Sequence, residues 1–410
     1  MKKALKISVA ASKSYFQRAL AISALAKGTS VLHQISWCND SIAAKNIIED
    51  LGSNISENKR TLSIKTEGLD FKNTKYTAGE AGLSVRMFSP IFALSDKKIT
   101  FIGEGSLKTR PIQIISDALM QLGVQVETQE GMLPIKIKGK IKAGEIHIDG
   151  SLSSQLLTGL LIALPLLDGD SVINVSQLKS KPYVDMTLSI MKEFGVEVEN
   201  EDYKIFRIKG HQQYKPTDYY IEGDWSGGAF FLVYGAVKQD VEIVNLDYRS
   251  QQADKAFLEA LQKAGAKVNL NHKSVRVEKA ELKAFVFDAT ECPDLFPPLV
   301  CLASQCTGVS EIKGISRLSY KESDRAQVLK QEFQKMGIAI QLKQDSMFIT
   351  GGKIKPCIVD SHNDHRIAML GGIMNLFCDG EITVKNKEAI NKSYPNFFED
   401  LKILSSFDKK

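Results

Sequence analysis

The chain has 410 residues, of which 43% are hydrophobic and 25% charged. This composition is typical of globular protein, and the length exceeds what one hydrophobic core usually organises, so we expect two domains. The net charge of +5 is modest and the basic residues are dispersed, which gives no support to nucleic-acid binding but suits small anionic substrates.

The cysteines and the N-terminus bear on the cellular compartment. The six cysteines form no CxxC pair and show no ligand spacing with the six histidines, which argues against a structural zinc site and indicates reduced thiols. The segment from Met1 to Lys6 lacks the apolar core of a signal peptide, and no apolar run is long enough to span a bilayer. We therefore expect a cytoplasmic protein without a membrane partner.

The chain contains six copies of one supersecondary unit. A short strand, a polar turn and a strongly apolar helix recur at residues 5–26, 75–94, 145–167, 218–237, 284–304 and 356–377. Between them, amphipathic helices end at glycines about 70 residues apart, each followed by an alternating strand: Gly52, Gly123, Gly195, Gly265 and Gly337.

Helices that are apolar all round belong in the centre of a domain, and amphipathic helices belong outside. The predicted fold is therefore α/β (α+β), with two similar domains, each of three βαβαββ units around buried parallel helices, as in an inverse α/β barrel. The sixth unit ends without its last strands, so we expect the N-terminal strand to complete the C-terminal domain. That domain would comprise residues 1–9 and 222–410, and the other residues 10–221. The chain would then connect the two domains at two places, an arrangement that suits hinge closure over a ligand in an interdomain cleft.

The turns that open the helices of the first three units carry anion-binding side chains, since helix N-termini favour anions. Lys13, Ser14 and Arg18 suit a carboxylate or phosphate, although a capped helix with a surface arginine is the alternative. Further on, Gly82 allows close approach of backbone to a ligand. The group is completed by two arginines that can clamp the ligand, Arg86 and Arg110. It also includes a set of neutral donors: Ser153, Ser154, Gln155, Ser180 and Tyr183.

The later units add two carboxylates. Residues 320–325 are predicted to open an amphipathic helix that ends at Gly337, and helical spacing places Glu322 on its inward face as a candidate proton carrier. A surface ion pair between Glu322 and Arg325 is the alternative. Asp294 precedes an apolar run and is either the second acid/base group or an N-cap. The sixth unit supplies residues 363–366 and Lys392.

Together these motifs resemble the 5-enolpyruvylshikimate-3-phosphate synthase family, over essentially the full length of the chain. The resemblance implies two domains that close on their substrates, with the N-terminal domain forming the shikimate-3-phosphate side and the C-terminal domain the phosphoenolpyruvate and acid/base side. It also implies transfer of the enolpyruvyl (carboxyvinyl) group to the 5-hydroxyl by addition and elimination, as part of the shikimate pathway of aromatic amino-acid biosynthesis. No metal or organic cofactor is implied, and a monomer is expected.

The resemblance also implies a role for each residue. Glu322 would serve the methylene proton and Asp294 the hydroxyl proton, with Lys13 and Lys321 stabilising charge. The set implied for shikimate-3-phosphate is Lys13, Ser14, Arg18, Ser153, Ser154, Gln155, Ser180, Tyr183, Asp294, Arg317 and Lys321. The set implied for phosphoenolpyruvate is Lys13, Gly82, Arg86, Arg110, Gln155, Arg325, His365, Arg366 and Lys392.

The chain departs from the family where most members have Asn and Thr, at Glu80 and Leu83, and Ala10 and Ala11 replace a common Pro-Gly. A carboxylate at position 80 would weaken phosphoenolpyruvate binding or pair with an arginine. One alternative is the sister transferase that acts on UDP-N-acetylglucosamine, whose members commonly carry a cysteine in the loop matching residues 103–109, where this chain has none. The other is a non-catalytic anion-binding or nucleic-acid-binding protein, which would not need both Asp294 and Glu322.

Overall fold

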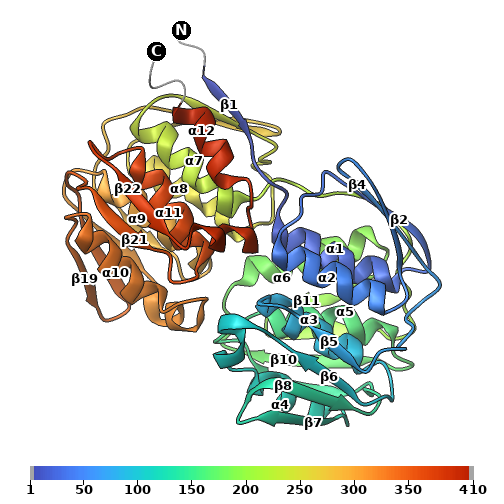
Figure 1. Ribbon diagram of the computed structural model, residues 1–410. Helices are drawn as coiled ribbons and strands as arrows, with labels where there is room; N and C mark the ends of the chain where they lie inside the picture. Colours follow the sequence, from blue (N-terminus) through green and yellow to red (C-terminus); the bar gives the residue numbers. More distant parts are fainter. Residues whose placement is uncertain (1–3, 406–410) are drawn as a thin grey trace. The chain divides into compact units, whose positions relative to one another are not determined.

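The computed structural model describes residues 4–405, so Met1, Lys2 and Lys3 of the N-terminal segment and residues 406–410 lie outside the described part (Figure 1). Contacts between residues divide the chain into two compact units. The C-terminal unit comprises residues 1–12 and 222–410, and the N-terminal unit residues 13–221, so the chain passes between them twice. The substrate roles assigned above to the two domains stay predictions. Across residues 4–405, no helix combines the length and the apolar character that a membrane span requires.

The N-terminal unit has two kinds of helix. Its inner helices are buried along nearly their whole length: α1 (Lys13–Leu25), α3 (Gly82–Phe92) and α5 (Gln155–Ala163). Its outer helices bury one side only: α2 (Asn39–Asp50), α4 (Gln113–Gln121) and α6 (Lys181–Glu193). The strands are β2 (Gly28–His33), β3 (Asn54–Asn58), β4 (Thr61–Thr66), β5 (Lys75–Thr77), β6 (Ile99–Ile102), β7 (Gln125–Gln129), β8 (Met132–Lys138), β9 (Glu145–Asp149), β10 (Ser171–Ser176), β11 (Glu199–Glu201), β12 (Ile205–Ile208) and β13 (Asp218–Tyr220).

The C-terminal unit repeats this division. Its buried helices are α7 (Trp225–Val237), α9 (Phe296–Ser304) and α11 (His365–Asn375). Its outer helices are α8 (Phe257–Lys263), α10 (Arg325–Lys335) and α12 (Phe397–Ser405). The strands are β1 (Leu5–Ser8), β14 (Val241–Val244), β15 (Lys267–Asn271), β16 (Ser274–Glu278), β17 (Val286–Asp288), β18 (Val309–Lys313), β19 (Ile340–Lys343), β20 (Ser346–Thr350), β21 (Cys357–Asp360) and β22 (Ile382–Lys385).

The sheets confirm the predicted repeat. In the sheet β5-β6-β8-β7, β5 pairs parallel with β6, β6 antiparallel with β8, and β8 antiparallel with β7. The sheets β9-β10-β12-β11 and β17-β18-β20-β19 have the same order. A parallel pair needs a crossover connection, and in each of these sheets the inner helix supplies it. The predicted fold class is therefore confirmed.

Two strands are exchanged between the first and fourth repeats. The N-terminal strand β1 belongs to the C-terminal unit and pairs parallel with β14 of the fourth repeat, with Leu5 opposite Val241. The place it leaves in the first repeat is taken by β13, with Asp218 opposite Val31. The assignment of residues 218–220 to the fourth unit was therefore wrong. Among the described residues the sheet of the sixth repeat has two strands, β21 and β22.

The five recurring glycines end the outer helices as predicted. Gly52, Gly123, Gly195, Gly265 and Gly337 all have φ between +81° and +94°, a conformation that glycine adopts without the penalty of a Cβ. The residue after each glycine donates its N–H to a carbonyl one turn back, for example Val124 to Leu119 at 3.1 Å and Ile338 to Phe333 at 2.9 Å. This is the Schellman motif.

Gly123 provides a test of this interpretation. A Cβ added there would meet nothing closer than 3.5 Å, so the change Gly123→Ala is opposed by its φ of +81° and not by lack of space. We expect it to lower the free energy of unfolding by about 1 kcal/mol, measured by urea denaturation. The control is Gly144→Ala, where the nearest atom is 3.8 Å away and φ is not positive. Equal losses in both variants would contradict the conformational explanation.

Candidate active site

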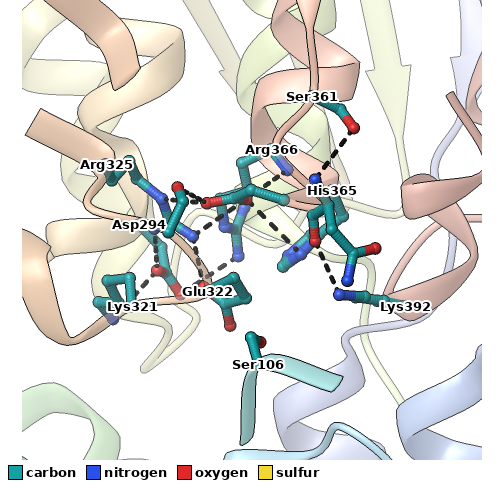
Figure 2. Close-up of polar contacts among 12 residues, drawn as sticks. Ser106, Asp294, Lys321, Glu322, Arg325, Ser361, His365, Arg366 and Lys392 are labelled. Carbon is teal, nitrogen blue, oxygen red and sulfur yellow. Dashed lines mark hydrogen bonds and ion pairs between the residues drawn. The ribbon is translucent and has the colours of Figure 1, made fainter. Parts of the chain in front are cut away.

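The C-terminal unit gathers carboxylates around one guanidinium group, that of Arg325 (Figure 2). Its side chain is fully buried. Nη1 donates to Asp294 at 2.9 Å and Nη2 to Glu322 at 2.7 Å. Nε and Nη2 both donate to Asp364, at 3.0 and 3.3 Å. Burial alone would lower the pKa of Arg325, but Asp364, Glu322 and Asp294 outweigh it and raise the pKa above its usual value.

The helix that carries Arg325 begins later than predicted. Asp324 caps it, accepting from the N–H of Gln327 at 3.3 Å, and α10 begins at Arg325. Lys321 ends a 3₁₀ helix (Ile315–Tyr320) in an extended conformation, so Glu322 lies before the helix and not in its first turn. The prediction that helical spacing turns Glu322 inward was therefore wrong. Glu322 is oriented instead by its ion pair with Arg325, and its side chain is 19% exposed.

Asp294 stands among three cations. It lies in a short 3₁₀ helix (Pro293–Leu295) directly before α9, and its side chain makes no cap to that helix. Its oxygens pair with Lys321 at 3.2 Å, with Arg325 and with Arg366 at 3.2 Å. Burial would raise the pKa of Asp294, but Arg366, Lys321 and Arg325 together hold it well below its usual range. Burial lowers the pKa of Lys321, although Asp294 opposes that shift.

The start of α11 supplies the other side of the cluster. Asp364 is fully buried and caps this helix by accepting from the N–H of Arg366 at 2.9 Å. It also accepts from the hydroxyl of Ser323 at 3.1 Å. His365 and Lys392 are both buried, and Lys392 Nζ donates to the carbonyl of Asn363 at 2.7 Å. The motif singled out at residues 363–366 includes Asp364, but no role was predicted for it; its position at a helix start, equivalent to that of Asp294, was the available signal.

In the N-terminal unit, the candidate residue Arg18 is also buried, but its partners are neutral. Nε donates to Thr187 Oγ1 at 2.9 Å, Nη1 to the carbonyl of Ser14 at 2.9 Å, and Nη2 to Thr158 Oγ1 at 3.3 Å and to the carbonyl of Tyr183 at 3.4 Å. Burial lowers its pKa to about 10, so it stays charged at neutral pH. Within residues 4–405 no carboxylate forms an ion pair with it. A buried cation without a carboxylate favours an anionic ligand.

The start of α1 is held by a carboxylate that sequence reasoning missed. Lys13 Nζ lies 2.7 Å from Asp40 Oδ2, in the first turn of α2. Gln17 donates to the carbonyl of Asp40 at 3.0 Å and to Ser84 Oγ at 3.1 Å. These contacts connect the starts of α1, α2 and α3, and they fix the ammonium group of Lys13 at that junction.

Two arginines meet at Gly82. A Cβ at Gly82 would lie 2.9 Å from Arg110 Nη1 and 3.0 Å from Arg86 Nη1, so both guanidinium groups lie against the glycine backbone. Arg86 also donates to Gln155 Oε1 at 3.3 Å, which adds the start of α5. Two adjacent guanidinium groups repel each other, and an anion bound between them would relieve that repulsion.

Glu80, the departure from the family pattern, has a partner on the neighbouring loop. Its Oε2 accepts from the N–H of Ser106 at 3.2 Å and from its hydroxyl at 3.4 Å. Ser106 belongs to a 3₁₀ helix (Gly105–Thr109) that leads directly to Arg110. Glu80 therefore fixes the loop that carries Arg110.

The remaining candidates lie at helix starts or on turns. Ser153 accepts from the N–H of Gln155 at 3.2 Å, and Ser154 is buried at the N-cap of α5. Ser180 is the N-cap of α6, with φ of +59°. Arg317 lies in the 3₁₀ helix before Lys321 and donates to the carbonyl of Thr290 at 3.3 Å.

The protein has two units, each built from three α/β repeats, with cations and carboxylates at the starts of their helices. These are the features of an enolpyruvyl transferase. A family model described as EPSP synthase (3-phosphoshikimate 1-carboxyvinyltransferase) matches residues 3–401. The chain therefore belongs to the EPSP synthase family, and the resemblance noted in the sequence is confirmed.

Curated relatives and solved structures agree with the family model. The chain is 37% identical over 407 residues to a 3-phosphoshikimate 1-carboxyvinyltransferase of Clostridium novyi, which covers 96% of this chain and 94% of the relative. It is 38% identical over 405 residues to that of Clostridium acetobutylicum, with 97% and 94% covered. A solved EPSP synthase of Acinetobacter baumannii matches with a TM-score of 0.82 at 25% identity, with 97% and 94% covered.

The buried charge of Asp364 predicts a measurable stability effect. Asp364→Asn keeps an oxygen that can cap α11 but removes the charge that balances Arg325, and breaking a buried ion pair costs about 3 kcal/mol. We expect a loss of that size in the unfolding free energy of the C-terminal unit, measured by urea denaturation. Asp324→Asn is the matched control: it changes an exposed N-cap and should lose less than about 0.5 kcal/mol. An equal effect of both changes would contradict the importance of burial.

Proposed function

We propose that this chain transfers the carboxyvinyl group of phosphoenolpyruvate to the 5-hydroxyl of shikimate-3-phosphate and releases phosphate, the reaction for which its curated relatives are named. The observation that carries the proposal is the pair of carboxylates, Asp294 and Glu322, bound to the same buried guanidinium group. The reaction needs two groups that carry protons and cations that stabilise the phosphate. A non-catalytic anion-binding protein would need only the cations.

The chemistry proceeds by addition and elimination. In the addition, the hydroxyl oxygen bonds to the enol carbon, the hydroxyl loses its proton, and the methylene carbon gains one to become a methyl group. In the elimination, the methyl group returns its proton to the group that supplied it, and the bond between the carbon and the phosphate oxygen breaks. The departing phosphate takes up the proton that the hydroxyl gave in the addition, which restores the double bond and both acid/base groups. Two general acid/base groups are sufficient, because each is returned to its starting state by the second step.

We assign the methylene proton to Glu322 and the hydroxyl proton to Asp294. Asp294 begins as a weak base, because Arg366, Lys321 and Arg325 keep its pKa low. An anionic substrate that draws Arg366 and Lys321 to itself weakens their hold on Asp294 and raises its basicity. Binding of the substrate would thus prepare the base. His365, Lys392 and Arg325 complete the part assigned to phosphoenolpyruvate in this unit, and Arg317 the part assigned to shikimate-3-phosphate.

The N-terminal unit supplies further anion-binding groups. Arg18, whose partners are neutral oxygens, suits the carboxylate of shikimate-3-phosphate, with Lys13 and Ser14 beside it. Hydroxyls and an amide suit its phosphate without adding charge. These are Ser153, Ser154, Gln155, Ser180 and Tyr183. The guanidinium pair at Gly82, formed by Arg86 and Arg110, suits phosphoenolpyruvate.

We also infer a cytoplasmic monomer that acts without nucleic acid. The six cysteines are free, and four of them are buried, which suits a reducing compartment. Burial raises the pKa of Cys301 well above its usual value, so this thiol is held in its neutral form.

The test is phosphate release by the purified protein with shikimate-3-phosphate and phosphoenolpyruvate. Glu322→Gln keeps the side-chain shape but cannot carry the proton, so we expect kcat to fall about a thousandfold. Binding of shikimate-3-phosphate, measured by calorimetry, should remain within about threefold of wild type, because no anion-binding cation is changed.

Asp324→Asn is the matched control, since it alters an exposed carboxylate two residues away and should leave kcat near the wild-type value. An active Glu322→Gln variant would remove Glu322 from its proposed role. If UDP-N-acetylglucosamine supported phosphate release and shikimate-3-phosphate did not, the substrate assignment would be wrong.

A further inference from the structure

A fourth carboxyl group, that of Asp254, is buried in the C-terminal unit close to this cluster. It lies in a 3₁₀ helix (Ala253–Ala256) that leads into α8, and it is 1% exposed. Its Oδ2 accepts a hydrogen bond from Ser226 Oγ, in the first turn of α7. Its Oδ1 is buried and, in the described residues, has no hydrogen-bond partner. None of the roles given above uses this residue.

The cation that interacts with Asp254 is Arg366, which is also buried. Nη2 of Arg366 donates to Asp294 at 3.2 Å, but its Nε is buried and has no partner among residues 4–405. Asp254 and Arg366 are close enough for each to alter the ionisation of the other. Arg366 therefore donates a hydrogen bond to the carboxylate of Asp294. The carboxyl group of Asp254 is a second possible partner, to which Arg366 makes no hydrogen bond in the described residues.

The charges nearby explain why Asp254 is not simply a second ion-pair partner. Lys321, Arg325 and Arg366 are already matched by three carboxylates, those of Asp294, Glu322 and Asp364. An ionised Asp254 would add an unbalanced negative charge in a buried place, which is unfavourable. The pKa of Asp254 is raised to about 7, chiefly by burial and secondly by the negative charge of Asp294.

Other groups near Asp254 also shift its pKa, each in a definite direction. Asp224, the N-cap of α7, raises the pKa of Asp254, whereas Arg366 and the hydroxyl of Ser226 lower it. Cys292 is also near, and burial raises its pKa well above the usual value, so that it stays a neutral thiol. Asp254 is therefore a buried carboxyl group whose pKa lies near neutral pH.

We propose that Asp254 is a positioning residue that controls Arg366: when protonated it leaves Arg366 to Asp294 and the anionic substrate, and when ionised it draws Arg366 away. This inference rests on the proposed role of Arg366 at the phosphoenolpyruvate side. Loss of one proton from Asp254 gives its carboxyl group a negative charge, which makes it a stronger acceptor for the Arg366 guanidinium group and also repels the carboxylate of Asp294. Both effects weaken the arrangement that holds an anion. The affinity for phosphoenolpyruvate therefore falls as the pH rises through about 7.

The experiment is the pH dependence of kcat/KM for phosphoenolpyruvate in the wild type and in Asp254→Asn, which fixes a neutral side chain. The ratio of variant to wild type should rise from about one at pH 6 to about tenfold at pH 8. A residue with a merely structural role would lower kcat/KM equally at every pH, so parallel profiles would overturn the proposal. Asp247→Asn, a change to a nearby carboxylate outside the cluster, should leave the profile unchanged.

Ser226→Ala provides a second variant, and its effect has a predictable sign. The hydroxyl of Ser226 lowers the pKa of Asp254. Removal of this hydroxyl should therefore shift the decrease of kcat/KM for phosphoenolpyruvate to higher pH. A shift to lower pH would contradict the proposal. This variant keeps the test available if Asp254→Asn does not fold.

A spectroscopic measurement separates this inference from the proposed function. Difference infrared spectroscopy of the wild type between pH 5 and 9 should show a protonated carboxyl band that disappears around pH 7 and is absent in Asp254→Asn. Failure to release phosphate would contradict the function but leave this band in place. Absence of the band in the wild type would overturn the inference even in an active enzyme.

Discussion

The buried guanidinium group of Arg325 is the constraint on which the candidate site in the C-terminal unit depends. Three carboxylates from three elements converge on it: Asp294 before α9, Glu322 before α10 and Asp364 at the start of α11. Without that charge, three like charges would lie together away from water, which is strongly unfavourable. The same bonds that neutralise Arg325 hold the two proposed proton carriers in place. The stability of this region and the geometry of the chemistry therefore have one origin.

The repeat explains how the carboxylates come together. Asp224, Asp294 and Asp364 are spaced by 70 residues in each step, and each stands at the start of a buried helix. Equivalent helices in the N-terminal unit begin at Lys13, at Gly82 and at Gln155. One scaffold thus presents carboxylates in one unit and cations or neutral donors in the other. Under the proposed function, this difference in helix-start residues places the proton-carrying carboxylates in the C-terminal unit.

Much of this could be predicted from the sequence, because glycine caps and wholly apolar helices are local signals. The positive φ at Gly195 follows from the residue type and its place after a helix. Long-range choices were less accessible: β1 and β13 are both short strands, and the sequence does not specify which repeat each one joins. Glu322 was selected for the wrong reason, since the helix begins at Arg325. Asp40 was missed, and Asp364 was given no role, because a carboxylate at a helix start is taken for an ordinary cap until its partners Lys13 and Arg325 are seen.

The balance of charge around Asp294 has a consequence for the order of events. Lys321, Arg325 and Arg366 are paired with carboxylates of the chain itself, so an anion can bind to these three cations only by competing with those carboxylates. Arg325 is fully buried and makes four hydrogen bonds, which makes it the hardest to recruit. Lys321 and Arg366 make fewer hydrogen bonds, and each forms an ion pair with Asp294. The cations easiest to recruit are therefore the ones that suppress the basicity of Asp294, so anion binding and activation of the base are a single electrostatic event.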